Sequence, residues 1–513
     1  MFSTILGERS GLILLLCLQF LVWGLFAPLF HSSHPLDVVE LTTLSNEWVI
    51  ANYKHPNLPG LLLDLMTYLT GPFWSVYLLS QFSIIAAYLC VYNLGKELVG
   101  STQSLVSVLL LSSVFYYHWP TPEFNHNVLQ IPLWALAILS VWRAVSTNSL
   151  GWWLVLGMTA GALLWTKYSA GVLLLVISVW LIVEPKAREQ LLTPYPWLAA
   201  AVAIVIALPQ ILYLLESDFL PFSYAANRAS EGSAVDAVKF IAAQLANHFL
   251  FLILIAIAGL LGRGMVIPSK PIYCEDISKD KSKALGHSSK EVAPLRNPNP
   301  KLFLLIMGLG PLLVVALLPV LAGVGLRSMW GAPMFNLSGL LFVYFLSGRL
   351  NASRIQRLKI SAFALMVTLG SAYVAQHLLR ATISDKPMRT QWPQAEIARY
   401  FHAEYLNKAN TPLKFVVSDY WLGGLIASAP VYSTRVKVDG DDLKSPWISD
   451  EQLLQQGALV AWPASSGPNA NQLDLLKRAG TRASAPHTGS FQWSADKPDS
   501  LIKIEYQLIL PRD

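Results

Sequence analysis

The chain has 513 residues, of which 54% are hydrophobic and only 13% are charged. Soluble proteins carry roughly 25% charged residues, so this composition excludes a soluble protein and indicates one that crosses a membrane several times. The net charge of +6 would suggest a nucleic-acid partner in a soluble protein. In a membrane protein the distribution of Lys and Arg among the loops matters more than their sum, and we expect membrane lipids, not nucleic acid, as partners.

Apolar runs long enough to cross a hydrocarbon core of roughly 30 Å predict about eleven transmembrane helices. The first run, from Gly11 to Phe30, contains no charged residue and lacks a small-residue cleavage site, so we expect a retained helix. The predicted spans cover residues 11–30, 73–94, 102–117, 127–142, 152–166, 169–184, 196–215, 237–262, 302–322, 333–348 and 360–379.

The apolar stretch from Trp152 to Val183 fits either one tilted helix or a tight hairpin that turns around Lys167. We favour the hairpin, because a single crossing would invert every later loop and export the basic segment at residues 263–301. With the hairpin and a cytoplasmic N-terminus, the loops on one side hold most of the Lys and Arg, as the positive-inside rule requires. The segment 263–301, rich in Ser, Pro and charge, is then predicted to be a cytoplasmic linker.

Hydrophobicity falls after the last predicted span, over residues 385–513, which is enough chain for a small soluble domain. Strand-like runs and an amphipathic helix at 392–406 predict an α/β fold for it. The strand-like runs are 413–417, 458–462 and 501–509. We therefore predict an all-α polytopic membrane domain over residues 1–384, with an outer loop at 31–72, followed by an α/β extracytoplasmic domain.

The cysteines give no support for a disulfide framework or a metal knuckle, because Cys17, Cys90 and Cys274 lie far apart in two predicted helices and one loop. Histidines and carboxylates near the spans leave a divalent metal open without specifying a ligand set. We therefore assign no cofactor from the sequence.

Ionisable residues next to apolar spans are costly and are treated as functional hypotheses. Under the predicted topology, four groups of them reach the same outer face. They are Asp37, Glu40, Lys54 and His55; Glu123, Asn125 and His126; Lys167 and Tyr168; and Glu216 and Asp218 with Arg327 and Trp330. Structural roles are the alternative for each, since acids can solvate a juxtamembrane helix and a lysine can anchor a helix end at the interface.

The chemistry of these residues suits a charged lipid substrate. Asp37 is the candidate general base, which would take a proton from an acceptor hydroxyl within hydrogen-bond reach. Lys167 and Arg327 would neutralise a phosphate and stabilise it as a leaving group. The cluster of Glu123 and His126 fits recognition of sugar hydroxyls at least as well as metal binding.

Three motifs carry a family resemblance. An acid follows the first helix, then come Lys-His-Pro-Asn-Leu-Pro from Lys54, Thr-Pro-Glu-Phe-Asn-His-Asn around Glu123, and Leu-Trp-Thr-Lys-Tyr around Lys167. In this order they resemble bacterial integral-membrane glycosyltransferases of family 39, relatives of the protein O-mannosyltransferases and of the aminoarabinose transferase that modifies lipid A. The most similar subgroup is the galacturonic-acid transferases of lipopolysaccharide core and lipid A.

The resemblance implies a GT-C fold and a donor in which a sugar is attached to a polyprenyl phosphate. It also implies a lipid or cell-envelope glycan acceptor, and an active site at the periplasmic face of the bacterial inner membrane. Asp37 then falls on the catalytic base, His55 on the lysine of a Lys-Pro-Pro-Leu segment, and Lys167 on a contact to the donor phosphate. The reaction would be an inverting displacement.

Two departures from the family pattern affect individual roles. Glu40 follows Asp37 by three residues where the family often has adjacent Asp-Glu, so Glu40 is expected to be a supporting residue. Lys54 precedes His55, which leaves open which of the two meets phosphate. The predicted donor-phosphate contacts are Lys54, His55, Lys167 and Arg327, and the predicted substrate-binding residues are Glu40, Glu123, Asn125, His126 and Tyr168.

Two other functions remain as alternatives at this point. A transporter or flippase of polyprenyl-linked lipids would also place charges near the membrane, although such proteins frequently show internal repeats that this chain lacks. A ligase or polymerase of surface polysaccharide would share the donor and the compartment.

Overall fold

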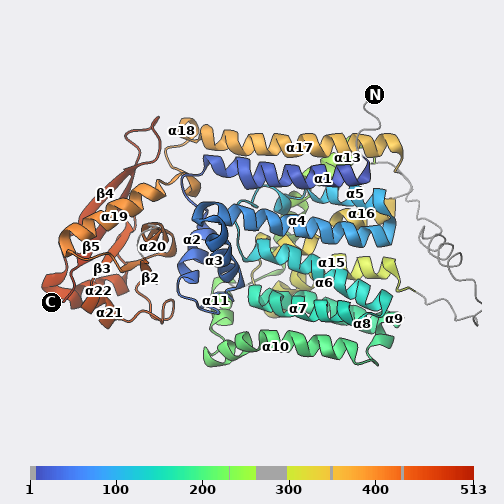
Figure 1. Cartoon of the computed structure of the whole chain (residues 1–513), viewed down its shortest axis with the longest axis horizontal. Coiled ribbons are helices and arrows are strands. Elements are labelled where there is room, and N and C mark those ends of the chain that lie inside the picture. Colours follow the sequence, from blue (N-terminus) through green and yellow to red (C-terminus); the bar gives the residue numbers. More distant parts are fainter. Residues whose placement is uncertain (1–6, 230–231, 261–296, 347–349, 429–432, 513) are drawn as a thin grey trace, which may run out of the picture.

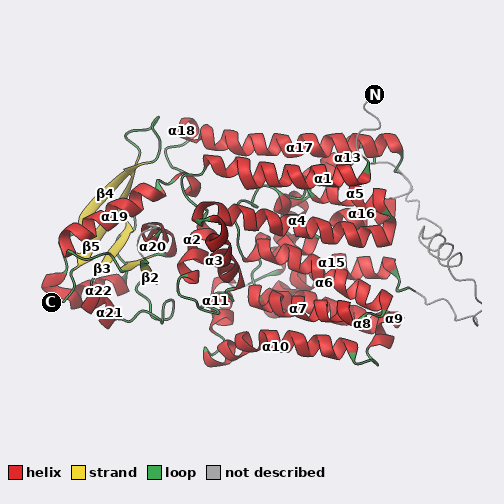
Figure 2. Ribbon diagram, viewed as in Figure 1, coloured by secondary structure: helices red, strands yellow, loops and turns green. Residues whose placement is uncertain are grey.

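The computed structural model describes residues 7–229, 232–260, 297–346, 350–428 and 433–512. A bundle of long helices occupies one end of the molecule and a small sheet with flanking helices the other (Figures 1 and 2). Most of the predicted linker 263–301, including Cys274, lies outside the described residues. Cys17 and Cys90 lie in helices, as expected, and are free.

In the part of the chain that is described, six helices are long and apolar enough to cross a membrane. They are α1 with its π and 3-10 extension (Glu8–Phe30), α4 (Pro72–Val99), α6 (His126–Thr147), α10 (Tyr195–Glu216), α15 (Pro300–Ala322) and α17 (Ala352–Leu378). Several begin at local start signals. The Asn125 and Asn299 side chains cap α6 and α15, and Pro72 opens α4.

Two bent helix pairs raise the number of candidate spans to eight. The pairs are α12 (Ala234–Asn247) with α13 (Phe249–Ile257), and η6 (Ser328–Phe335) with α16 (Ser338–Leu346). The other apolar helices are shorter: α3 (Leu58–Thr70), α5 (Ser101–Leu111), α7 (Leu150–Thr166) and α8 (Gly171–Val183) with its preceding turn η4 (Tyr168–Ala170). Each of the predicted apolar runs contains helix where it is described, but the count of about eleven crossings is not confirmed.

The span predicted at 102–117 illustrates the difference. Helix α5 ends at Leu111, because the hydroxyls of Ser112 and Ser113 donate to the backbone oxygens of Leu109 and Leu110 and the chain then turns into an irregular loop. Such local side-chain bonds compete with helix continuation. The apolar run thus continues beyond its helix into the loop that carries Glu123.

The predicted hairpin at Lys167 is present. Helix α7 ends at Thr166, Lys167 has extended backbone angles (φ −165°, ψ 134°), and η4 leads into α8. The short helix α9 (Pro185–Gln190), which follows α8, lies at the end of the bundle remote from the sheet (Figure 1). The chain therefore returns to that end after the turn.

The two ends of the bundle differ in what they contact. At the end remote from the sheet, Arg143 Nη2 lies 2.7 Å from Glu97 Oε1, and the Arg143 guanidinium lies 4.7 Å from the centre of the Trp152 ring. At the other end, α2 (Leu36–Ser45) and α3 lie between the bundle and the sheet domain (Figure 1). Which end faces the cytoplasm remains a prediction.

The C-terminal part is α/β. Its sheet has the order β2-β1-β3-β5-β4, with the first three strands parallel and the last two antiparallel. The strands are β1 (Phe415–Ser418), β2 (Arg435–Val438), β3 (Ala458–Pro463), β4 (His487–Gln492) and β5 (Leu501–Ile509). The helices are α19 (Gln394–Ala409), α20 (Tyr420–Ala427), α21 (Asp450–Gln456) and α22 (Ala470–Ala479). The strand-like runs found in the sequence are β1, β3 and β5, and the amphipathic helix is α19.

Helix α20 joins the two parts of the molecule by packing against α2. The contact is close at Gly424, where a Cβ atom would overlap the Val39 side chain. Beside it, Arg435 Nε lies 3.0 Å from both carboxylate oxygens of Glu47, whose side chain is only 4% exposed. The α/β domain therefore fixes the position of α2, the helix that carries Asp37.

Candidate active site

A cavity of about 660 Å³ opens at the end of the bundle that faces the sheet domain. Its walls come from the start of α2, the loop after α5, the start of α6, η6, the end of α17 and the segment before α19. The polar and charged residues that line it are Asp37, Tyr116, Glu123, Asn125, Asn127, Asn247, Ser328, Tyr373, Gln376, His377, Arg389 and Thr390. Segments far apart in the sequence thus form one chamber.

Asp37 lies in the first turn of α2, directly after Pro35 and Leu36. Its backbone N–H donates to Glu123 Oε1 (2.9 Å), and its carboxylate Oδ2 accepts from Asn125 Nδ2 (2.9 Å). No described residue donates a hydrogen bond to Oδ1. The carboxylate lines the cavity with one oxygen left for a ligand, which is the arrangement that a general base requires.

Asn125 positions Asp37 and also starts α6. Its Oδ1 accepts the backbone N–H groups of Asn127 and Val128, and its Nδ2 donates to Asp37. The amide is therefore used at both ends by the protein. The predicted role of Asn125 in substrate binding remains untested, but these contacts give it a positioning role.

The loop that carries Glu123 is held by buried polar contacts. The backbone oxygen of Thr121 accepts from the Ser80 hydroxyl and from Gln81 Nε2 (3.3 Å), and Gln81 Oε1 accepts from Gln19 Nε2 (2.9 Å). These side chains belong to α4 and α1 and are fully buried. Because buried hydrogen bonds of this kind tie three segments together, the loop is rigidly placed.

Glu123 differs from Asp37 in its surroundings. Burial, and then the neighbouring charge of Asp37, raise the pKa of Glu123 to about 7, while the Asp37 N–H and Arg389 act in the opposite direction. Glu123 can therefore exchange a proton near neutral pH. Two neighbouring carboxyl groups with different surroundings are suited to hold one charge rather than two.

Lys167 stands behind the cavity wall. Its Nζ donates to Asn127 Oδ1 (2.7 Å), and Asn127 lines the cavity. Burial lowers the pKa of Lys167 to about 8, and the charge of Asp37 opposes that shift. Asn127 therefore lies between the ammonium group and the chamber.

His55 and His126 lie next to each other outside the set of residues that line the cavity. Their ring centres are 4.7 Å apart, and His126 Nε2 donates to the backbone oxygen of Pro56 (3.0 Å). The turn that contains them is closed by Asn52 Oδ1, which accepts the N–H groups of Lys54 and His55. These two histidines therefore brace the turn after α2 against the start of α6.

Lys54 and Glu40 lie at the contact with the α/β domain. Lys54 Nζ is 2.8 Å from Glu40 Oε1 and 4.5 Å from the centre of the Tyr420 ring, which belongs to α20. Tyr168 donates to Gln210 Oε1 (3.3 Å) and stacks on Phe222, away from the cavity lining. The structure does not bring these three predicted residues to the chamber that contains Asp37.

Arg327 is exposed and directly precedes Ser328 and Met329, which line the cavity. It forms no ion pair with any described carboxylate. Arg327 is therefore adjacent in the chain to the cavity lining but is not part of it.

Several cavity residues escaped the sequence reasoning. Arg389 lies in the short turn η8 (Arg389–Gln391) between the last span and the α/β domain, and Tyr373 and His377 lie in the last turns of α17. They belong to no motif, and they come within reach of Asp37 only because the chain folds back over more than 300 residues.

A buried histidine, His31, contacts Tyr373, which lines the cavity at the end of α17. Its Nδ1 and Nε2 lie 2.9 Å from the hydroxyls of Tyr77 and Tyr373, and burial lowers its pKa to about 3. His31 is therefore neutral at physiological pH and links α4 to α17.

Comparisons with known proteins add to this geometry. The model of the family described as dolichyl-phosphate-mannose-protein mannosyltransferase matches residues 54–213. The lipid A galacturonosyltransferase RgtD of Rhizobium johnstonii is 27% identical over 225 residues, which cover 42% of this chain and 45% of RgtD. The match thus spans less than half the length of that relative.

Two solved structures match nearly the whole chain. ArnT from Cupriavidus metallidurans bound to undecaprenyl phosphate has a TM-score of 0.62 at 12% identity, covering 97% of this chain and 98% of ArnT. Its apo form has a TM-score of 0.54 at 13% identity, covering 98% and 99%. The chain therefore has the fold of ArnT over nearly its whole length. The resemblance to GT-C glycosyltransferases inferred from the motifs is confirmed.

The range matched by the family model covers only part of the cavity lining. It includes Glu123, Asn125 and Lys167, whereas Asp37 and Arg389 lie outside it. The lining is therefore completed by residues from other parts of the chain.

Metal ligands do not converge in the GT-C bundle as far as it is described. No three His, Cys, Asp or Glu side chains among the described residues could hold one metal ion. We therefore assign no metal-ligand set to this site.

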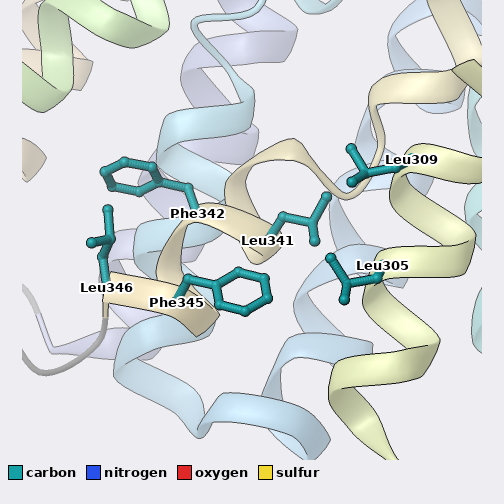
Figure 3. A pocket seen from close by; sticks show the side chains of 6 residues that line it. All are labelled: Leu305, Leu309, Leu341, Phe342, Phe345 and Leu346. Atoms are coloured by element: carbon teal, nitrogen blue, oxygen red, sulfur yellow. The ribbon is translucent and has the colours of Figure 1, made fainter. Parts of the chain in front are cut away.

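A second cleft, of about 480 Å³, lies between α15 and α16 and is lined only by hydrocarbon side chains (Figure 3). They are Leu305, Leu309, Leu341, Phe342, Phe345 and Leu346. The cleft contains none of the predicted site residues and offers no group for catalysis.

Proposed function

We propose that this protein transfers a sugar from a polyprenyl-phosphate donor to a lipid A or other envelope glycan acceptor, at the outer face of the bacterial inner membrane. The observation that carries the proposal is Asp37, whose carboxylate lines a chamber of about 660 Å³ with Oδ1 left for a ligand. The name of RgtD as a lipid A transferase and the undecaprenyl phosphate bound by ArnT support the choice of acceptor and donor.

The proposed reaction is a single displacement. Asp37 takes the proton from an acceptor hydroxyl as its oxygen forms a bond to the anomeric carbon. The bond between that carbon and the phosphate oxygen breaks, its electron pair leaves with the polyprenyl phosphate, and the configuration is inverted. Because the leaving phosphate is already an anion, cations rather than a second acid stabilise its departure.

The cations proposed for the phosphate differ in access. Lys167 is separated from the chamber by Asn127, to which it donates, and Arg327 directly precedes the lining residues Ser328 and Met329. His55 remains a candidate through its place in the motif, and Lys54 would first have to leave Glu40. Glu123, with a pKa of about 7, is proposed to orient the sugar and to keep the Asp37 backbone in place.

The test is transfer by the purified full-length protein in proteoliposomes. Radiolabelled undecaprenyl-phosphate sugars serve as donors and lipid A as acceptor, and the product is identified by mass spectrometry. We expect label on lipid A with the wild type and its loss with Asp37→Asn, whereas Asp64→Asn on α3, outside the cavity lining, retains activity.

Three outcomes would overturn parts of the proposal. Equal transfer by wild type and Asp37→Asn would remove the base from Asp37. Movement of the lipid donor across the bilayer without sugar transfer would identify a transporter. Products carrying polymeric sugar chains would identify a ligase or polymerase.

The proposed sidedness has its own test. Alkaline phosphatase fused to the C-terminus is active only after export, so we expect an active fusion in intact cells. An inactive fusion, together with an active fluorescent protein at the same point, would place the α/β domain in the cytoplasm.

A further inference from the structure

The segment before α19 forms one wall of the chamber and is fixed on both sides. The backbone oxygen of Thr390 accepts the N–H groups of Ser32 (2.8 Å) and Ser33 (3.1 Å), just before α2. The Thr390 hydroxyl lies 3.0 Å from His377 Nε2, and Gln391 Nε2 donates to the His377 backbone oxygen (2.9 Å). Arg389 therefore projects from a backbone that is held in place.

The guanidinium of Arg389 is available to a ligand. It lies 4.7 Å from the centre of the Trp421 ring, a contact that orients its plane without using its N–H donors. Arg389 is exposed, lines the chamber, and donates no side-chain hydrogen bond to any described residue. It also forms no ion pair with the carboxylates that are described, in contrast to Lys54 with Glu40.

Arg389 is also close to the reacting side of the chamber. Its charge lowers the pKa of Glu123, whose Oε1 accepts the N–H of Asp37. A cation in this place would raise the local concentration of an anionic substrate group and hold it near Asp37.

We propose that Arg389 binds an oxyanion of the substrate, a phosphate or a carboxylate, in the chamber that contains Asp37. The planar fork of a guanidinium matches both anions in a bidentate manner, and orientation by Trp421 reduces the entropy lost on binding. This inference rests on the proposed function and deepens it, because it assigns a charged substrate group to a residue outside the matched motifs.

Three sources of the oxyanion are separated by matched substrates. The donors are undecaprenyl phosphate bearing a uronic acid and the same lipid bearing the neutral hexose. The acceptors are bis-phosphorylated lipid A and lipid A without its phosphates. Each is assayed with wild type, Arg389→Gln, Arg389→Lys and the control Arg399→Gln, an exposed arginine on α19.

We expect Arg389→Gln to raise KM for the substrate that carries the anion by roughly 10- to 100-fold, with a smaller change in kcat, since a hydrogen bond to a charged group contributes on this scale. Arg389→Lys should show a smaller rise in KM than Arg389→Gln, and the control Arg399→Gln should show no rise. If KM rises for both donors, Arg389 binds the donor phosphate. If KM rises for the uronic acid donor alone, Arg389 binds the sugar carboxylate. If KM rises only for phosphorylated lipid A, Arg389 binds a phosphate of the acceptor.

Unchanged KM for all four substrates in a folded, active Arg389→Gln protein would overturn the assignment while leaving the proposed function intact. The assignment would also be overturned if KM rose equally for lipid A with and without phosphates while KM for both donors stayed unchanged. Folding is followed by size-exclusion chromatography and thermal unfolding in detergent. If the wild type transfers no sugar from any donor, the proposed function fails first, and stabilisation by undecaprenyl phosphate alone then tests Arg389 through binding.

Discussion

The acids carried by α2 and the turn after it have different roles although they lie within eleven residues of one another. Asp37 lines the chamber and its Oδ1 accepts no hydrogen bond from the described residues, whereas Glu40 is paired with Lys54. Glu47 is paired with Arg435 of the α/β domain and is almost fully buried. The comparison teaches that the partners of a carboxylate, rather than its presence beside the membrane, decide whether it can serve chemistry.

The largest expected effect is the difference in kcat between a variant of Asp37 and a variant of Glu40. Asp37→Asn should lower kcat by about 100-fold or more, because positioned general bases contribute on the order of 10² to 10⁴. Glu40→Gln, which keeps a hydrogen-bond partner for Lys54, should lower kcat less than about 5-fold under the same reasoning. Initial rates of sugar transfer give both values, and equal losses in the two variants would contradict the comparison.

A variant of Lys167 tests whether the cation behind the chamber wall contributes to the reaction. Lys167→Met keeps the length of the side chain and removes the charge, so kcat should fall by roughly 10- to 100-fold through lost stabilisation of the leaving phosphate. Lys239→Met, at an exposed lysine of α12, is the matched control. Transfer rates at saturating donor measure the effect, and a wild-type rate in Lys167→Met would restrict Lys167 to a structural role.

The pair of Glu47 and Arg435 should affect stability more than chemistry. Arg435→Gln leaves a nearly buried carboxylate without its cation, and the free energy of unfolding should fall by about 2–3 kcal/mol. Thermal unfolding in detergent measures this loss, while kcat per folded molecule should stay near wild type. Lys497→Gln breaks an exposed ion pair with Asp385 and should hardly change Tm. A loss of kcat without a loss of Tm in Arg435→Gln would reverse this interpretation.

The last expected effect is a pH dependence of stability at Glu123. Its pKa is about 7 in the folded protein and near 4.5 when unfolded, so the folded state binds the proton more tightly. Stability contributed by the protonated group is therefore lost as pH rises from about 4.5 to 7. Relative to Glu123→Gln, which stays neutral, the wild type should lose Tm over this window and then level off. Parallel Tm curves for the two proteins would contradict the raised pKa.

Local patterns were sufficient for much of the fold. The length of apolar runs located the helices, and the polar interruption at Lys167 located the hairpin, because each depends on residues next to one another in the chain. Short apolar runs located β1, β3 and β5 for the same reason. Helix ends were less predictable, as at Leu111, where two serine hydroxyls end α5 inside an apolar run.

The candidate site was predicted in part. The motifs indicated Asp37, Glu123 and Lys167, and the structure brings Asp37 and Glu123 into hydrogen-bond contact, with Lys167 one side chain away. The motif around Lys54 could not show that its ammonium group meets the Tyr420 ring, because that contact joins segments about 370 residues apart. Arg389 was missed for the same reason.

The sequence by itself determined a polytopic helical membrane protein with an α/β C-terminal part, and it selected the acid after the first helix. Hydropathy, cap signals and short motifs act over a few residues, so they can be recognised in the chain alone. Only the tertiary structure decided which charges remain available to a substrate. Folding pairs Glu40 with Lys54 across the turn after α2, pairs Glu47 with the distant Arg435, and leaves Asp37 and Arg389 in one chamber. The chain alone does not show these pairings, because they depend on how the turn and the remote segments pack.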